Sequence, residues 1–138
     1  MKYIKSCGFV AFRQINGDRK YLIIKSHNGD VGFPKGHTEP GESEIETAIR
    51  ELKEETGALV NILPGFARRI EYPLPGKVDT IKQSVYFLGK CVSNTITPQE
   101  SEVAWVDFLS YSEALDRLTF DETKSILSDA ERFIENKK

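Results

Sequence analysis

Three glutamates, Glu51, Glu54 and Glu55, are the residues of this chain whose types and spacing best suit joint chemistry. Their i, i+3 and i+4 spacing places the three carboxylates on one side of a helix. Like charges at that spacing cost a helix about 0.2–0.5 kcal/mol per pair, and a bound cation removes that cost. Mg²⁺ prefers oxygen ligands and keeps several waters, which substrate phosphates can replace. The alternative is a solvated acidic face, softened by pairing of Arg50 with Glu46 and Glu54.

The stretch 36–58 contains these glutamates and predicts a turn followed by a helix. Ser43 and Glu46 have the spacing of a capping box, so the helix is expected to begin at Ser43. Gly57 predicts its end, because glycine enters the left-handed region without a steric penalty. Between these ends one helical face is apolar and is expected to be buried; it consists of Ile45, Ala48, Ile49 and Leu52.

Gly36 and Glu42 precede the run from Arg50 to Gly57. Five residues separate Gly36 from Glu42, and seven separate Glu42 from Arg50. This arrangement resembles the Nudix box, and every fixed position of that motif is filled. Ala58 is the one departure, because the family usually has a larger aliphatic residue there. Resemblance to Nudix hydrolases implies an α/β fold, an α/β/α sandwich with a mixed central sheet. It also implies a Mg²⁺-dependent hydrolase of a nucleoside diphosphate linked to another moiety, with Mn²⁺ as the alternative metal.

The same resemblance implies roles for individual residues of the motif. Glu51 and Glu55 would be the principal metal ligands, and the Gly36 carbonyl would add a further ligand. Glu54 would be another ligand or the base that orients water. Arg50 would hold the glutamates in place, so Arg50, Glu51 and Glu54 are predicted to be catalytic.

Basic residues next to the motif are predicted to bind phosphate. Lys35 directly precedes the motif glycine, and we expect it to contact phosphate and to assist catalysis rather than to be a solvated surface lysine. His37 would donate to a phosphate, or else be a plain surface histidine. Lys82 is the third candidate, since the resemblance implies that it meets phosphate.

The resemblance also implies one more acidic ligand or base, from the loop before Trp105. Two glutamates stand in that loop. Glu100 is taken as the candidate metal ligand, with Glu102 as the alternative, and the sequence does not separate them.

Several segments resemble one subfamily more closely, the asymmetrical diadenosine tetraphosphate hydrolases of the animal and archaeal type. They are GFVAF with Phe9, segments 33–37 and 39–42, Lys82 ahead of 85–88, and the stretch from Glu113-Ala114 to Phe120. This resemblance implies cleavage of diadenosine tetraphosphate to ATP and AMP, and it implies that Tyr72 and Phe120 stack on adenine. One alternative is another nucleotide pyrophosphatase, acting on oxidised nucleoside triphosphates or RNA 5′ ends. The other is a non-catalytic nucleotide-sensing Nudix module.

The bulk composition fits one globular domain over residues 1–138, with 39% hydrophobic and 29% charged residues. A net charge of −2 gives no global attraction to nucleic acid, so we expect a small nucleotide substrate and no stable nucleic-acid partner. Cys7 and Cys91 lack CxxC partners and are expected to be buried, without zinc or a disulfide framework. No segment has the length of a membrane span or the form of a signal peptide, so a cytoplasmic location is expected.

The order of elements predicts the architecture. Strands are predicted at 3–12, 21–25, 31–33, 59–63, 66–72, 82–91 and 103–108. Asn16-Gly17 is a hairpin signal between the first two. Further helices are predicted from Ser110, by a second capping-box spacing, and at about 121–135, where an apolar stripe is expected in the core. Strands, one helix, more strands and then helices favour a mixed sheet with helices on both faces.

Overall fold

The computed structural model describes residues 1–93 and 96–137. The sequence assigns 94 and 95 to a loop, and that prediction lies outside the described residues. The strands are β1 (Lys2–Ile15), β2 (Asp18–Ser26), β3 (Val31–Gly32), β4 (Lys35–His37), β5 (Val60–Pro73), β6 (Thr80–Cys91) and β7 (Val103–Ser110). The helices are α1 (Glu44–Thr56), α2 (Tyr111–Arg117) and α3 (Asp121–Asn136).

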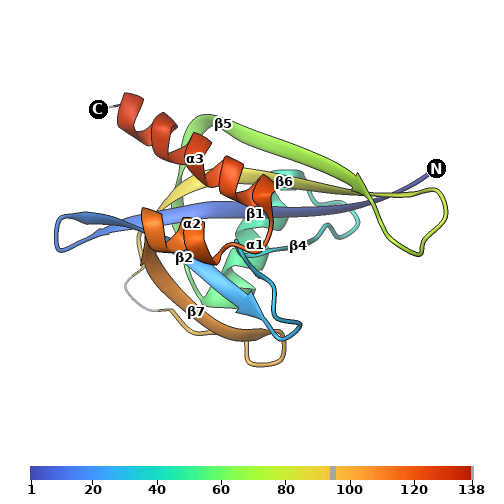
Figure 1. The fold of residues 1–138 in the computed structure, drawn as a ribbon, viewed down its shortest axis with the longest axis horizontal. Coiled ribbons are helices and arrows are strands. Elements are labelled where there is room, and N and C mark those ends of the chain that lie inside the picture. Colours follow the sequence, from blue (N-terminus) through green and yellow to red (C-terminus); the bar gives the residue numbers. More distant parts are fainter. Residues whose placement is uncertain (94–95, 138) are drawn as a thin grey trace.

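These strands form one mixed sheet (Figure 1). Its order is β3-β2-β1-β6-β5, with β4 pairing to β1 and β7 pairing to β2. β1 and β6 run parallel, whereas the other described pairs are antiparallel. The predicted mixed sheet is therefore confirmed. The pairing of β4 with β1 places Gly36 opposite Cys7, which brings the start of the motif onto the sheet.

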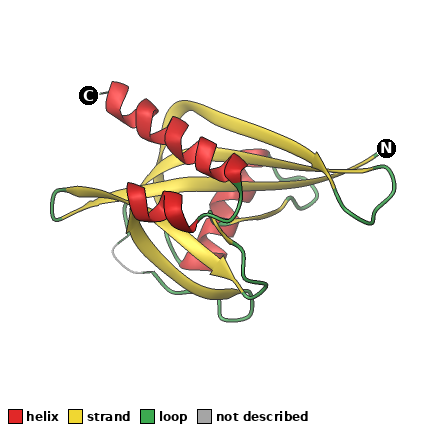
Figure 2. Ribbon diagram, in the orientation of Figure 1, coloured by secondary structure: helices red, strands yellow, loops and turns green. Residues whose placement is uncertain are grey.

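Helices cover both faces of this sheet, as the sequence predicts (Figure 2). α1 packs on one face, where Ala48 and Leu52 are buried in a core cluster with Cys7 and Val85. α2 and α3 pack on the other face, in a second core cluster. The predicted stripe of α3 is confirmed, with Phe133 partly buried and the rest buried: Ile126, Leu127, Ala130 and Ile134. The two layers of helix thus hold opposite sides of the site described below.

The ends of α1 confirm their sequence signals. The Ser43 hydroxyl accepts a hydrogen bond from the Glu46 N–H at 3.2 Å, and the Glu46 carboxylate accepts one from the Ser43 N–H at 2.8 Å. Gly57 ends the helix with φ of 76°. The prediction that Ile49 is buried is wrong, because its side chain is 40% exposed. The buried stripe of α1 is therefore narrower than the apolar periodicity indicates.

The edge strand β5 corrects another prediction. The sequence predicts two strands separated by Pro64-Gly65, but β5 is continuous. Its register against β6 shifts between Ile62 and Ala67, so a bulge absorbs the proline and the glycine. Proline lacks the N–H that a ladder needs, and an edge strand tolerates that loss at a bulge. The continuous strand carries Tyr72 alongside β6.

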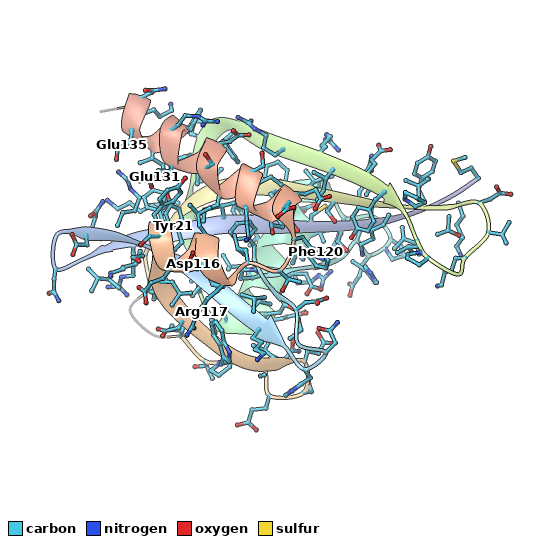
Figure 3. All side chains as sticks on the ribbon, viewed as in Figure 1. Tyr21, Asp116, Arg117, Phe120, Glu131 and Glu135 are labelled. Carbon is cyan, nitrogen blue, oxygen red and sulfur yellow. The ribbon has the colours of Figure 1, made fainter. Side chains whose placement is uncertain are left out.

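The hairpin between β1 and β2 is confirmed, and it also fixes α3 (Figure 3). Asn16 and Gly17 have φ of 53° and 85°, as a tight hairpin turn requires. On β2, the Arg19 guanidinium donates to Glu131 of α3 at 3.0 Å, and the Tyr21 hydroxyl donates to the same carboxylate at 2.5 Å. These bonds hold α3 on the sheet, and the residue that precedes α3 lies at the site.

Both cysteines are free thiols. Cys7 is buried, as predicted, and Cys91 is partly buried. Burial raises the pKa of each thiol to about 11, so both are protonated at neutral pH. None of the helices in the described ranges is long and apolar enough to cross a membrane.

Candidate active site

The acidic side of α1 lies against the backbone of β4. A Cβ built on Gly36 would lie 2.1 Å from Cδ of Glu51 and 2.2 and 2.5 Å from its two carboxylate oxygens. Only a residue without a side chain leaves room for this carboxylate. The structure therefore brings together two of the residues predicted to bind metal.

Glu55 is the most buried acidic group of α1, with 6% of the residue exposed. Its Oε1 accepts a hydrogen bond from the Lys35 N–H at 2.8 Å. Burial raises the pKa of Glu55 to about 8, the Lys35 bond opposes that shift, and the nearby carboxylates Glu51 and Glu102 add to it. Burial likewise raises the pKa of Glu51. The pKa values of both carboxyls are thus raised by burial, and carboxyls with perturbed pKa values are common at functional sites.

Arg50 organises the glutamates. Its Nε and Nη2 donate to Glu42 at 2.7 and 3.0 Å, and its Nη1 donates to Glu51 at 2.8 Å and to Glu54 at 3.2 Å. Nη2 also donates to the His37 carbonyl at 3.0 Å. The Arg50 guanidinium lowers the pKa of Glu42 to about 2. A single planar side chain thus joins α1, the loop before it and β4.

One predicted partner of Arg50 is wrong. The sequence allows Arg50 to pair with Glu46, but the Glu46 carboxylate accepts the Ser43 N–H at the helix start. Capping therefore engages Glu46, and Arg50 bonds the three other glutamates named above.

Lys35, His37 and Lys82 form a cationic cluster. Lys82 Nζ donates to the Ser6 hydroxyl at 2.7 Å and lies 3.2 Å from Nε2 of His37. Burial lowers the pKa of Lys82 to about 8, and the Lys35 cation adds to that effect. Burial lowers the pKa of Lys35 and of His37 as well, and both lysines lower the pKa of His37 further. A polyanion would relieve this mutual repulsion, which is the electrostatic character of a phosphate site.

The loop before β7 brings one of its two glutamates toward α1. Glu102 acts electrostatically on Glu51 and on Glu55, raising the pKa of both. Glu100 instead uses its backbone carbonyl to bond His27 Nε2 at 2.7 Å. The His27 N–H donates to the Glu102 carbonyl at 3.3 Å. These contacts favour Glu102 over Glu100 as the acidic residue that this loop contributes.

A cavity of about 370 Å³ lies beside these groups. Lys35 and Glu55 line it, and so do Tyr72 and Phe120. Tyr72 is 40% exposed and Phe120 is 50% exposed, so both rings are accessible. Phe120 directly precedes α3 (Figure 3). One predicted phosphate-binding residue and one predicted metal ligand therefore share a cavity with the two predicted aromatic residues, whereas His37, Lys82 and Glu51 do not line it.

Comparison with known proteins agrees with this geometry. Residues 7–129 match the NUDIX domain family. The chain belongs to the Nudix family. A bis(5′-nucleosyl)-tetraphosphatase (asymmetrical) from Mus musculus is 29% identical over 146 residues, covering 95% of each chain. A C. elegans Ap4A hydrolase, solved as a binary complex, superposes with a TM-score of 0.87 at 25% identity, covering 96% of this chain and 98% of that one.

A further relative is named for a different activity. It is an 8-oxo-(d)GTP phosphatase from Mycolicibacterium smegmatis, 30% identical over 106 residues, which is 77% of this chain and 31% of that protein. This chain is therefore a Nudix hydrolase related to Ap4A hydrolases, with the α/β fold that the motif implies.

Nudix hydrolases generally use divalent metal ions. Over residues 1–93 and 96–137, no group of three His, Cys, Asp or Glu side chains is arranged to hold a metal ion. Arg50 and the Lys35 N–H bond the carboxylates instead. The donor set nevertheless fits Mg²⁺, which proteins often bind through one or two carboxylates, with waters and substrate phosphates completing the shell. Glu51 and Glu55, beside the backbone of Gly36, would supply those ligands.

Sequence reasoning missed several residues around the cavity. Tyr86 is buried in the core, and it also lines the cavity. Ser84 and Asp30 line it too. Strand alternation contained the signal for two of them, because Ser84 and Tyr86 follow Lys82 at two-residue intervals and share its face of β6.

Replacing Gly36 with alanine tests the contact between β4 and Glu51. Gly36 does not have a positive φ, so alanine is acceptable to the backbone. The three atoms nearest the new Cβ belong to the flexible end of the Glu51 side chain, so the fold should survive while the carboxylate is displaced. We expect Gly36→Ala to change Tm by only a few degrees and to lower kcat/KM about 10²-fold, the scale of an ångström-size misplacement. Unchanged turnover would show that the position of the Glu51 carboxylate is unimportant.

Proposed function

We propose that this Nudix hydrolase cleaves diadenosine tetraphosphate to ATP and AMP with Mg²⁺ as its cofactor. One observation carries the proposal: a single cavity is lined by a buried carboxylate and a lysine, Glu55 and Lys35, and by two accessible aromatic rings, Tyr72 and Phe120. That is the chemistry of a polyphosphate ending in a base. The names of the mouse and C. elegans relatives support the same substrate class.

Different residues of the chain would bind the metal and act as the base. Glu51, Glu55 and the Gly36 carbonyl would hold the metal, with Glu54 as a further ligand or the base. When bound, the metal would supply charge neutralisation at the phosphoryl oxygens and an acidified water. Glu54 suits the role of base, because its carboxylate is partly exposed and held by one bond from Arg50, within reach of water.

The cationic cluster of Lys35, His37 and Lys82 would bind the polyphosphate from the other side. Lys82 Nζ and His37 Nε2 lie within hydrogen-bond distance of each other, at 3.2 Å, so a phosphate oxygen beside this pair could contact both. Lys35 would add a second positive charge near it. As the P–O bond breaks, negative charge increases on the phosphate oxygens. Lys35 and Lys82 would offset that charge without any proton transfer.

The two aromatic rings would hold adenine. Stacking on an aromatic side chain contributes about 1–3 kcal/mol per base in single-stranded nucleic acid, and the same interaction serves here. Tyr72 on β5 and Phe120 before α3 approach the cavity from different elements.

Glu102 and Glu100 give a matched pair of substitutions for the acidic residue from the loop. We expect Glu102→Gln to lower kcat roughly 10–100-fold, as loss of a residue supporting a metal site does. The fall in kcat for Glu100→Gln should be at least tenfold smaller, because the bond from Glu100 to His27 uses the backbone carbonyl, which this substitution keeps. Steady-state kinetics of both variants checks this. The reverse ranking would assign the role to Glu100.

A second candidate is hydrolysis of oxidised nucleoside triphosphates, which the M. smegmatis relative favours by its name. A non-catalytic sensor is disfavoured, because none of the three motif glutamates is missing. The decisive experiment is a product-resolved assay of diadenosine tetraphosphate, 8-oxo-dGTP and triphosphorylated RNA, with and without Mg²⁺ or Mn²⁺. ATP and AMP as the dominant products support the proposal, and faster turnover of either other substrate overturns it. A cytoplasmic location and the lack of a stable nucleic-acid partner remain predictions.

A further inference from the structure

Ser84, in the middle of β6, has a buried hydroxyl that makes no hydrogen bond of acceptable distance and angle within the part of the chain that the structure describes, although the phenols of Tyr72 and Tyr86 approach it. The residue is 1% exposed. Ser84 also lines the cavity of the candidate active site. Burying an unpaired hydroxyl costs stability, so such a group calls for a physical explanation. The cavity that it lines offers one, since a bound molecule could supply the missing hydrogen bond.

The position of Ser84 on the strand relates it to the rest of the site. Side chains alternate along β6, so Lys82, Ser84 and Tyr86 share one face. On the neighbouring strand, Tyr72 is opposite Lys82 and Ile70 is opposite Ser84. On this face of β6, Ser84 therefore lies between Lys82, which belongs to the cationic cluster, and the buried Tyr86.

Aromatic rings surround Ser84 on the cavity side, whereas on β1 the residue opposite it, Ser6, bonds the Lys82 ammonium at 2.7 Å. Phe33 packs edge-on against Tyr86, with ring centroids 5.5 Å apart, and both line the cavity. Burial raises the pKa of Tyr72 and of Tyr86, and the approach of each phenol to the Ser84 hydroxyl opposes that shift. Ser84 therefore adds a polar atom to a wall that otherwise suits a flat, apolar ring.

The charges along the cavity argue against a phosphate beside this hydroxyl. The carboxylates of Asp30 and Glu122 line the same cavity, and both act on the Tyr72 phenol. Acidic groups near Tyr72 repel phosphate and leave it to the cationic cluster around Lys82 and Lys35. The group beside Tyr72 and Ser84 is then the uncharged part of the nucleotide.

We propose that the Ser84 hydroxyl is a specificity-determining contact, which hydrogen-bonds one polar edge atom of the purine base stacked in the cavity. The proposal rests on the nucleotide-binding part of the proposed function. Stacking on aromatic rings accepts every base, because every base has a π-face. A hydroxyl that is unpaired without ligand discriminates, because a base lacking the matching atom leaves it unpaired.

Equilibrium binding of ADP and three analogues tests the contact without relying on turnover. The analogues lack the 6-amino group (purine), N1 (1-deazaadenine) or N7 (7-deazaadenine), and each carries the ribose diphosphate. In calorimetry with Mg²⁺ present, one analogue should bind the parent protein about tenfold more weakly than ADP. Ser84→Ala should bind that analogue and ADP equally, with ADP itself weakened about tenfold. The Tm of ligand-free Ser84→Ala should equal or exceed that of the parent, because an unpaired buried hydroxyl has been removed.

Thr123 provides the matched control. It lines the same cavity, but its hydroxyl already donates to the Phe120 carbonyl at 2.8 Å. Thr123→Val should therefore lower Tm and keep the parental ranking of ADP against the three analogues.

Two results would overturn the proposal. If Ser84→Ala weakens all four ligands equally, the hydroxyl meets the ribose or the phosphates, or does not meet the ligand. If Ser84→Ala lowers Tm as Thr123→Val does, the hydroxyl has a structural partner. Failure of the proposed function looks different, since the parent would then bind these nucleotides without hydrolysing diadenosine tetraphosphate.

Discussion

Glu55→Gln is expected to abolish most turnover while making the metal-free protein more stable. Loss of a metal ligand removes several kcal/mol of transition-state stabilisation. A loss of about 4 kcal/mol corresponds to roughly a 10³-fold fall in kcat/KM. Glutamine has nearly the same shape as glutamate, and its carbonyl oxygen can still accept the Lys35 N–H that Glu55 accepts. The fold should therefore be retained, and the change in activity can be assigned to the lost charge.

The gain in stability follows from the pKa of the Glu55 carboxyl. In the folded protein burial raises it from the ordinary 4.5 to about 8. Between those values the folded state binds a proton that the unfolded state has released, so stability falls as pH rises. Without metal, Glu55→Gln should remove this loss and add about 1–3 kcal/mol at pH 7–8, with little effect below pH 4.5. Urea unfolding of both proteins at pH 4.5 and pH 8, with EDTA present, measures this difference in the free energy of unfolding.

Glu46→Gln is the control for this prediction. Glu46 is on the same helix, and glutamine also completes a capping box. Its activity should remain within about twofold of the parent, the scale of a surface substitution. Near-normal turnover of Glu55→Gln would refute the role of Glu55 as a metal ligand, whatever its effect on stability.

Arg50→Lys should weaken metal binding and turnover about 10–100-fold, although it keeps the positive charge. The Arg50 guanidinium donates in one plane to Glu42, Glu51 and the His37 carbonyl. A lysine ammonium is a point charge on a flexible stem, so it cannot make those bonds together. Glu51 would then lose its orientation. Metal titrations and steady-state kinetics should show both effects.

Arg69→Lys is the matched control for Arg50→Lys. Arg69 also binds a carboxylate through two bonds, to Glu44 at 2.6 and 2.7 Å, but it lies on the surface outside the glutamate cluster. Its replacement should leave metal affinity unchanged. An equal loss in both variants would mean that any weakened ion pair on α1 lowers activity, and the organising role of Arg50 would be refuted.

The motif could be predicted from the sequence because its geometry is local. Helical periodicity alone places Glu51, Glu54 and Glu55 on one side of α1. The capping pair and Gly57 then define the ends of that helix, and the structure confirms both ends. The aromatic candidates Tyr72 and Phe120 line one cavity, and their stacking on adenine stays a prediction.

The remaining features depend on contacts between distant segments. Glu102 lies near α1 because the loop that contains it bonds the end of the helix, with the Gln99 N–H donating to the Glu55 carbonyl at 3.0 Å. His27, also distant in the sequence, bonds the same loop. Ile49 is exposed because the sheet covers only part of the apolar face of α1. In the sequence Pro64-Gly65 is typical of a strand end. Only the pairing with β6 shows that the edge strand β5 continues through these two residues as a bulge. Ser84 is recognised as a candidate only from the structure, which shows that its buried hydroxyl lacks a hydrogen bond among the described residues.

Calorimetric titration of Mg²⁺ and of Mn²⁺ into the purified, folded protein tests the central claim most directly. If the carboxylates on one side of α1 are gathered by a cation, the parent protein should take up metal saturably, and Glu55→Gln should bind it at least tenfold more weakly. Addition of ADP should tighten binding, since phosphates complete the metal shell. Failure of the folded protein to bind either metal, with or without nucleotide, would contradict the account.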